Sequence, residues 1–199
     1  MEIIVATGNK DKVREFREIF EGTDVRVVSM KEAGLFHEVE ETGRTFAENA
    51  LIKARALGKQ AHAVVAADDS GLVIDALGGA PGVYSSRFLG EDTPYAVKNA
   101  KILDLMKNVP EARRTCRFVC AMAAVFPDGT ECTAEAAFEG HVAYRSAGSH
   151  GFGYDPIFFL PGYGKTSAEL LPEEKNAISH RGKALRMLKE KIDAWAACQ

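Results

Sequence analysis

Asp68 and Asp69 directly follow the apolar run Ala63–Ala67, whose composition predicts a buried strand that stops at the acidic pair. α/β proteins usually place their chemistry where such strands end, so the pair is a candidate for catalysis. Neighbouring residues of a strand point to opposite faces, and we therefore expect one aspartate to face a cleft and the other to anchor the loop. Whichever aspartate faces the cleft can ligate Mg²⁺, although Asp68–Gly71 is equally compatible with an ordinary turn.

A second acidic side chain, Glu41, lies shortly before a predicted helix that runs from Phe46 to about Gln60. Thr45 and Glu48 match the capping box that opens helices. Glu41 can supply a second carboxylate to a metal ion, or simply stabilise the positive end of the helix dipole. Lys53, inside the same helix, is by default a solvated surface lysine.

The stretch Thr7–Lys12 (TGNKDK) connects a predicted strand at residues 2–6 to a predicted helix at residues 9–20. Gly8 permits close approach of a ligand to the backbone, and the unpaired N–H groups of a helix start suit phosphate. Lys10 and Lys12 add positive charge. The pattern is not a P-loop, which needs a second glycine followed by Lys-Ser/Thr, and a plain strand–helix turn also fits it.

An aromatic loop and a basic cluster follow late in the chain. Phe152 and Tyr154 lie between glycines in the stretch GFGYDP, where their rings can stack on a nucleobase or plug the loop. Three potential hydrogen-bond donors for a keto oxygen precede a last helix predicted at residues 183–197: Lys175, His180 and Arg181. Each of these features is weak alone, but together they describe a site for Mg²⁺ and a nucleoside triphosphate.

Length and composition predict one globular domain over residues 1–199, or two lobes that share one core. The formal charge of −3 gives no general attraction to nucleic acid or to an anionic membrane. No apolar stretch approaches the ~20 residues of a membrane span. The four cysteines match no zinc spacing and favour reduced thiols in the cytoplasm. Helices alternate with strands early and a long hairpin follows at residues 115–143, which predicts an α/β fold with a mixed sheet.

Five motifs occur in an order that resembles the non-canonical purine nucleoside triphosphate pyrophosphatases, also called inosine triphosphate or dITP/XTP diphosphatases. They are TGNKDK, EETGRTFAENALIKA, ADDSGL with LGGAPGVYSSRF, GFGYDPIF and EKNAISHR. The resemblance implies an elongated α/β fold with two lobes, a cleft between them and a central mixed sheet flanked by helices. It also implies a homodimer that hydrolyses ITP, dITP and XTP to the monophosphate and pyrophosphate.

The resemblance assigns a role to each matching position. Glu41 and Asp69 would bind Mg²⁺, and Asp69 would also accept a proton. The residues that would bind the phosphates are Thr7, Gly8, Asn9, Lys10, Asp11 and Lys12. Lys53 and Ser70 would contact the substrate. The base pocket would consist of Phe152, Gly153, Tyr154, Asp155, Lys175, His180 and Arg181, whose donors suit the 6-oxygen of hypoxanthine or xanthine and mismatch the amino group of adenine.

Other functions remain compatible with parts of the pattern. A Maf-like pyrophosphatase has a similar fold but acts on pyrimidine or modified nucleotides, and a substrate panel distinguishes the two groups. A non-hydrolytic nucleotide-binding module would not need both carboxylates of the metal site. A sugar-phosphate or nucleotide kinase is disfavoured because the sequence contains no P-loop.

Overall fold

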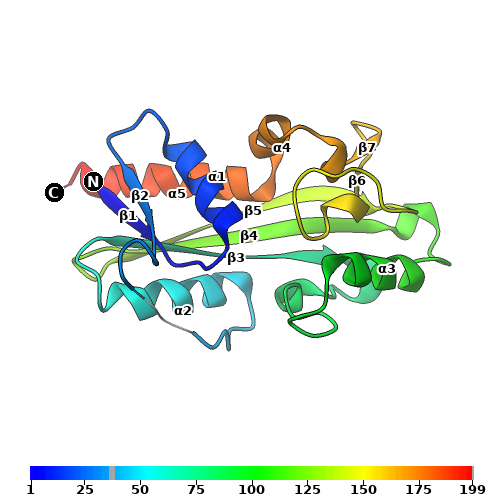
Figure 1. Cartoon of the computed structure of the whole chain (residues 1–199), viewed down its shortest axis with the longest axis horizontal. Helices are drawn as coiled ribbons and strands as arrows, with labels where there is room; N and C mark the ends of the chain where they lie inside the picture. The colour runs from blue at the N-terminus through cyan, green and yellow to red at the C-terminus, as the bar shows by residue number, and fades with distance from the viewer. Residues whose placement is uncertain (36–38, 199) are drawn as a thin grey trace. The chain divides into compact units, whose positions relative to one another are not determined.

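The computed structural model describes residues 1–35 and 39–198 (Figure 1). Within these residues the chain forms five α-helices and a seven-stranded mixed sheet, with strand order β2-β1-β3-β4-β5-β6-β7. The predicted α/β fold with a mixed sheet is therefore confirmed. The chain divides into two compact units, made of residues 1–69, 120–136 and 181–199, and of residues 70–119 and 137–180.

Parallel and antiparallel strands come from different parts of the chain. β1 (Glu2–Val5) pairs in parallel with β2 (Arg26–Ser29) and with β3 (Val64–Ile74). β4 (Thr115–Val125) and β5 (Glu131–Val142) are the strands of the predicted hairpin. β5 then pairs antiparallel with β6 (Phe158–Leu160), and β6 pairs antiparallel with β7 (Lys165–Thr166). The strand β7 was not predicted from the sequence.

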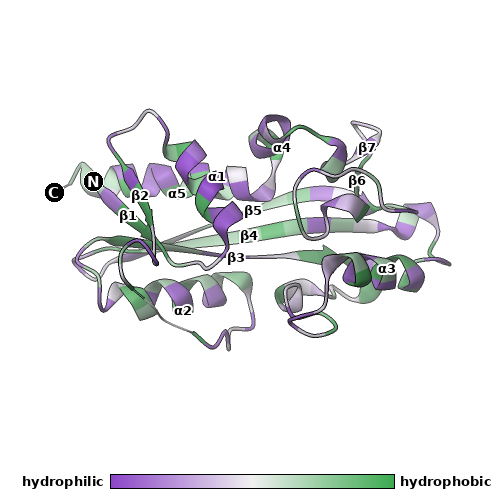
Figure 2. Ribbon diagram, viewed as in Figure 1, coloured by the Kyte–Doolittle hydropathy of each residue, from purple (hydrophilic) through white to green (hydrophobic). Residues whose placement is uncertain are grey.

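Two helical layers cover opposite faces of the sheet in the first unit (Figure 1). The helices α1 (Lys10–Phe20) and α5 (His180–Ala196) cover one face, where they pack on Ile3, Val5 and other residues of the same strand parity. The helix α2 (Phe46–Gly58) covers the other face and packs on residues of the opposite parity, such as Ile4. The period-two alternation of the strands thus assigns each apolar side chain to one layer. Figure 2 shows the hydrophobic colouring of β1 and of the middle of β4.

The second unit has its own apolar core around Phe158, which packs against Phe118 and Phe138 at ring-centroid distances of 4.4 and 5.3 Å. The helix α3 (Tyr95–Leu105) contributes to this core, and the short helix α4 (Pro172–Ile178) follows later in the chain. The helix α4 was not predicted from the sequence.

Several predicted boundaries differ from the observed ones. The strand predicted to stop at the acidic pair continues to Ile74, so Asp68 and Asp69 lie in the middle of β3. What ends there is the neighbouring strand, because β1 is paired with β3 only as far as Ala66. The last helix begins at His180 rather than at Lys183. The first turn of α5 therefore contains part of the basic cluster.

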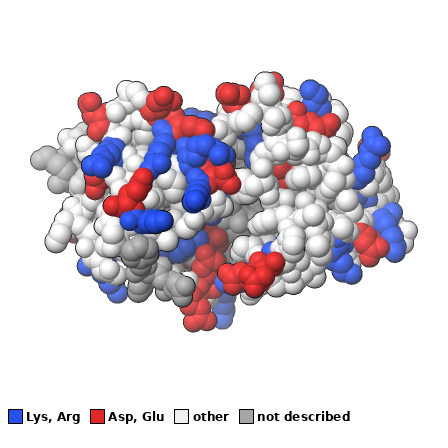
Figure 3. Space-filling view, viewed as in Figure 1, with Lys and Arg blue, Asp and Glu red and all other residues white. Residues whose placement is uncertain are grey.

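The surface of the first unit carries both signs of charge. Figure 3 shows Lys and Arg side chains next to Asp and Glu over the region of α1. Arg14 pairs with Asp11, and Arg17 with Glu32. This mixture agrees with the formal charge of −3. Among the residues described, no helix has the length and apolar character needed to cross a membrane.

Arg114 is a buried cation of the second unit whose partners are backbone carbonyls. Its guanidinium donates to the carbonyl oxygens of Val142, Met106 and Ala143 at 2.6–2.8 Å, and to that of Val109 at 3.3 Å. The Tyr144 ring lies 4.2 Å from the guanidinium carbon. Buried carbonyls require such donors, so Arg114 holds together the start of β4, the end of β5 and the segment after α3.

We predict that Arg114→Met destabilises the protein by about 3 kcal/mol or more, because each buried carbonyl left without a donor costs roughly 1–3 kcal/mol. Urea unfolding followed by circular dichroism measures this change. The neighbouring substitution Arg113→Met is the matched control, since Arg113 is exposed and should leave the unfolding midpoint nearly unchanged. Equal effects of the two substitutions would contradict the prediction.

Candidate functional site

The two adjacent aspartates of β3 point to opposite faces of the sheet. Asp68 lies on the same face of β3 as Val64 and Ala66, which pack under α1 and α5. Asp69 lies on the opposite face, with Val65 and Ala67, which pack under α2. Each carboxylate accordingly meets side chains from the helices on its own face. The structure therefore separates the acidic pair into two groups of charged residues within the first unit.

The first group surrounds Asp68, whose side chain is completely buried. Lys12, from the first turn of α1, places its Nζ 2.9 Å from Asp68 Oδ2, and the Nε of Arg181, from the first turn of α5, lies 3.5 Å from the same oxygen. Arg181 also donates to Glu15 at 2.7 Å. One buried carboxylate, one partly buried carboxylate and two cations thus compensate one another between β3, α1 and α5.

Asp68 and Arg181 of this first group stay ionised although they are buried. Burial alone would raise the pKa of Asp68, but Lys12, Arg181 and Lys53 outweigh it and hold that pKa well below its ordinary value of 3.8. Burial would lower the pKa of Arg181, but Glu15 and Asp68 raise it above its ordinary value. Both groups are therefore ionised at neutral pH.

The second group brings Asp69 together with Glu41, Lys53 and Asn49. The Nζ of Lys53 donates to Glu41 Oε1 at 2.7 Å and lies 3.5 Å from Asp69 Oδ1. Asn49 donates its Nδ2 to the other oxygen of Asp69, at 3.1 Å. Asn49 and Lys53 are four residues apart on α2 and share its sheet-facing side. Two carboxylates that are 28 residues apart in the sequence thus converge on one ammonium group.

In the second group, the balance of burial and neighbouring charge shifts the pKa of the aspartate the other way. It raises the pKa of Asp69 above 3.8, because the loss of water outweighs the attraction of Lys53, and the charge of Glu41 adds to this rise. The pKa of Lys53 is also raised, because its carboxylate neighbours outweigh burial. The two adjacent aspartates therefore have pKa values displaced in opposite directions, a pattern typical of sites where two carboxyl groups have different roles.

The Glu41–Asp69 pair is chemically suited to a hard divalent cation. Both groups offer carboxylate oxygens to the same cationic atom, which is the donor type that Mg²⁺ prefers. In the described part of the chain, no three His, Cys, Asp or Glu side chains converge in a way that could hold a metal ion. The two carboxylates of Glu41 and Asp69 nevertheless fit Mg²⁺. This ion is commonly bound by one or two carboxylates, while water and phosphate oxygens complete its coordination shell.

The TGNKDK loop is shaped by Asn9, the N-cap of α1. Its Oδ1 accepts from the amides of Asp11 at 2.9 Å and Lys12 at 3.4 Å, while its own amide donates to Thr7 Oγ1 at 3.2 Å. The prediction of unpaired N–H groups at this helix start is therefore wrong for these two amides, because a capping side chain occupies them. Lys10 is exposed.

Gly8 is exposed and is not required by the fold. Its φ lies outside the left-handed region, and a Cβ built at this position would meet only Met30 Cε, at 3.9 Å. In the protein without a ligand, a residue with a Cβ would therefore fit at position 8.

The GFGYDP loop of the second unit is held by Asp155, which is 2% exposed. Its carboxylate accepts from the amide of Phe152 at 2.9 Å, from Ser167 Oγ at 2.6 Å and from Lys175 Nζ at 2.6 Å. Lys175 Nζ in turn lies 5.3 Å from the centroid of the half-buried Phe152 ring. The structure thus brings Phe152, Asp155 and Lys175 into one cluster.

Tyr154 lies in the core of the second unit and is 3% exposed. Its hydroxyl donates to the carbonyl of Ser85 at 2.7 Å, and burial raises its pKa. The adjacent Gly153 accepts through its carbonyl from Asn99 Nδ2 at 3.1 Å. The ring of Tyr154 therefore anchors the loop, as the plug alternative predicted.

The remaining predicted residues are distributed over both units. Ser70 follows Asp69 on β3, in the second unit, and is half-buried. His180 is 5% exposed and stacks on Phe118, with ring centroids 4.9 Å apart and planes at 14°. Arg181 belongs to the Asp68 group of the first unit, whereas Lys175 belongs to the Asp155 cluster of the second.

Sequence reasoning missed Glu15 and Asn49, and it gave Asp68 no defined partner. Asn49 was detectable, because it occupies the apolar side of α2 between Phe46 and Ala50, where asparagine is a poor helix former. Glu15 gave no such indication, since a glutamate next to an apolar stripe is usual on a surface helix.

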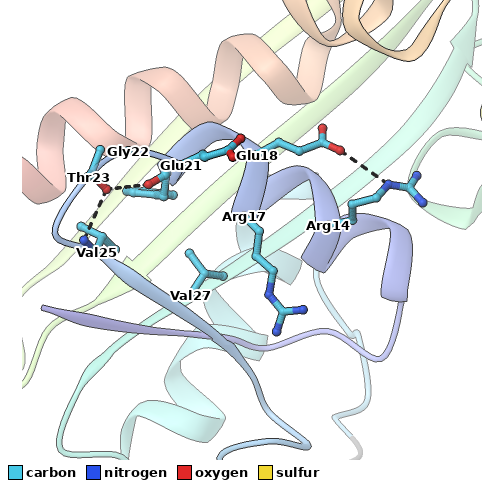
Figure 4. A pocket seen from close by; sticks show the side chains of 9 residues that line it. Arg14, Arg17, Glu18, Glu21, Gly22, Thr23, Val25 and Val27 are labelled. Atoms are coloured by element: carbon cyan, nitrogen blue, oxygen red, sulfur yellow. Dashed lines mark hydrogen bonds and ion pairs between the residues drawn. The ribbon is translucent and has the colours of Figure 1, made fainter.

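A separate hollow of about 400 Å³ lies near the end of α1 and the start of β2 (Figure 4). Both of its arginines have protein partners, since Arg14 pairs with Glu18 and Arg17 pairs with Glu32. None of the candidate site residues lines it. We therefore assign it no part in the site.

We predict that Asp68→Asn destabilises the protein by about 3 kcal/mol, the lower part of the range for breaking a buried ion pair, because Arg181 keeps Glu15 as a partner. Urea unfolding at neutral pH measures the change. Asp104→Asn is the matched control, since Asp104 pairs with Lys107 on the surface and its loss should hardly move the midpoint.

The low pKa of folded Asp68 also fixes the pH dependence of this difference. The carboxylate contributes fully above the pKa of the unfolded chain, and its contribution decreases as the pH falls toward the lower folded pKa. The stability difference between wild type and Asp68→Asn should thus shrink between about pH 5 and pH 3. A constant difference over that range would contradict the assignment.

Comparison with known proteins identifies the family. The sequence model of the Ham1 family matches residues 3–191. A dITP/XTP pyrophosphatase from Bacillus cereus is 49% identical over 196 residues, covering 98% of this chain and 96% of the relative. One from Geobacillus kaustophilus is 51% identical over 189 residues, covering 95% and 93%. The solved structure of a Ham1 protein from Coxiella burnetii, 39% identical, superposes with a TM-score of 0.89 over 98% of this chain and 99% of that one. The chain belongs to the Ham1 family.

Proposed function

We propose that the protein is a nucleoside triphosphate pyrophosphatase that hydrolyses the non-canonical purine nucleotides ITP, dITP and XTP to the monophosphate and pyrophosphate. The observation that carries the proposal is the convergence of Glu41 and Asp69 on one cationic atom. It occurs in a chain about half identical to proteins named dITP/XTP pyrophosphatases. This identity favours the purine substrates over the Maf-like alternative.

The metal and the attacking water are assigned to the Asp69 group. Glu41 and Asp69 would hold Mg²⁺, which when bound supplies positive charge to phosphoryl oxygens and acidifies a water molecule. Asp69 would accept the proton of that water. A metal-bound water is far more acidic than bulk water, so a carboxylate beside the ion can take up its proton.

The phosphates are assigned to Thr7–Lys12, with Lys53 and Ser70 as further substrate contacts. Lys10 is exposed and can meet an anion without giving up a buried partner. Gly8 supports the assignment. The protein has room for a Cβ at this position, so packing does not require a glycine there. Close approach of a ligand to the backbone would explain the glycine.

The base is assigned to Phe152–Asp155, Lys175, His180 and Arg181. Phe152 would stack on the purine, and donors would meet the 6-oxygen that hypoxanthine and xanthine share. Because Tyr154 and Asp155 are 3% and 2% exposed, they would act through their backbone and by holding Phe152 and Lys175 in place.

We also propose that residues 1–199 work as a single domain, and that the enzyme is a cytoplasmic homodimer. None of the four cysteines, all of which lie among the described residues, forms a disulfide, which supports a reducing compartment. The family resemblance supports the dimer.

The test is to incubate the purified protein with ITP, dITP, XTP and ATP in the presence of Mg²⁺. We expect pyrophosphate and the monophosphate from the first three nucleotides, much less product from ATP, and no turnover in excess EDTA. Release of orthophosphate, or equal turnover of ATP, would contradict the proposal. Absence of any hydrolysis would favour a non-hydrolytic binding module.

Asp69→Asn should lower the turnover of ITP at least ~10²-fold, because it removes the proton acceptor and one charged metal ligand. Steady-state kinetics at saturating ITP and Mg²⁺ measures the loss. Asp24→Asn, an exposed position of the first unit, controls for the substitution type. Turnover within a few-fold of wild type would remove Asp69 from the mechanism.

A further inference from the structure

Asn49 is a fully buried polar residue inside a helix, 0% exposed, on the side of α2 that also carries Phe46, Ala50 and Ala54. Asparagine is unfavourable in a helix interior, and a buried amide is costly unless its donors and acceptor are bonded. The contacts of Asn49 must therefore explain why an asparagine is present at this position.

The side-chain amide of Asn49 joins the two segments that carry the carboxylates. Its Nδ2 donates to Asp69 Oδ2 at 3.1 Å. Its Oδ1 accepts from the backbone amide of Gly43 at 2.8 Å, and Gly43 is two residues after Glu41. One rigid planar group thus fixes the strand that bears Asp69 relative to the segment that bears Glu41.

The space around Gly43 shows independently how closely the segment that bears Glu41 approaches α2. A Cβ at Gly43 would lie 2.5 Å from Asn49 Oδ1, 2.8 Å from Glu48 Cβ and 2.9 Å from Asn49 N, all closer than real Cβ contacts. The φ of Gly43 is outside the left-handed region, so backbone conformation does not require a glycine. The close approach to Asn49 is what excludes a side chain here.

Only an amide satisfies both contacts. The backbone N–H of Gly43 needs an acceptor, and the Asp69 carboxylate needs a donor. An aspartate would keep the first contact but would place a second carboxylate against Asp69. A leucine would leave the partly buried Gly43 N–H without its acceptor and would remove the donor to Asp69 Oδ2, so that Asp69 would keep only Lys53.

We infer that Asn49 is a positioning residue that sets the separation of Glu41 and Asp69, and thereby the affinity of the site for a divalent cation. The inference rests on the proposed function, which makes these two carboxylates the metal ligands. Groups that orient metal ligands typically change metal affinity or activity by 10–100-fold when they are mutated.

The central experiment compares wild type and Asn49→Ala for Mn²⁺ binding to the nucleotide-free protein, by electron paramagnetic resonance, and for the Mg²⁺ concentration that half-saturates ITP hydrolysis. We expect both the Mn²⁺ dissociation constant and the half-saturating Mg²⁺ concentration to rise ~10-fold or more. Saturating Mg²⁺ should restore much of the lost turnover. A purely structural role would lower the amount of active protein without moving either metal dependence.

Gly43→Ala tests the same contact from the other side and keeps Asn49 in place, so it serves if Asn49→Ala fails to fold. It should weaken metal binding in the same direction. Leu57→Ala is the matched control, since Leu57 is a buried residue of α2 in the apolar core. That control should lower thermal stability while leaving the Mn²⁺ affinity unchanged.

The outcomes separate the inference from the proposed function. Unchanged metal dependence in both Asn49→Ala and Gly43→Ala, with normal ITP hydrolysis by wild type, would overturn the inference alone. A wild type that binds no Mn²⁺ would overturn it as well. Weaker Mn²⁺ binding by both variants, in a protein that does not hydrolyse ITP, would support the positioning role and refute the proposed function.

Discussion

The site depends on the alternation of side chains along β3, which sends two consecutive carboxylates into two different environments. Asp68 meets cations from α1 and α5, and Asp69 meets an ammonium and an amide from α2. A shift of β3 by one residue would turn each aspartate to the opposite face of the sheet, away from its present partners. The register between β1 and β3 therefore determines the charge distribution of the first unit as well as its packing.

The two environments explain why adjacent residues with the same chemistry can differ in role. Asp68 is compensated by full positive charges, so it stays ionised and serves as a counter-ion. Asp69 has weaker compensation and another carboxylate nearby, so proton uptake is easier there. This division needs no difference in residue type. It follows from the helices that the sheet places on each face.

The sequence allowed the fold class, the main helices and the hairpin to be predicted, because these depend on periodicity and turn residues that are local in the chain. It misplaced the end of β3, since Asp68 and Asp69 resemble a turn until their partners from distant segments are known. It also missed the capping of the Asp11 and Lys12 amides by Asn9, and the role of Asn49, whose contacts lie 6 and 20 residues away. Local patterns carry no information about such partners.

The Lys53 ammonium between Glu41 and Asp69 has a consequence for the metal-free protein. Two carboxylates brought together without a counter-charge would repel each other and open the segment before α2. With the lysine in place, the first unit can complete its folding before any divalent ion arrives. Removal of metal by a chelator should thus leave the protein folded, in contrast to small domains whose folding is driven by zinc.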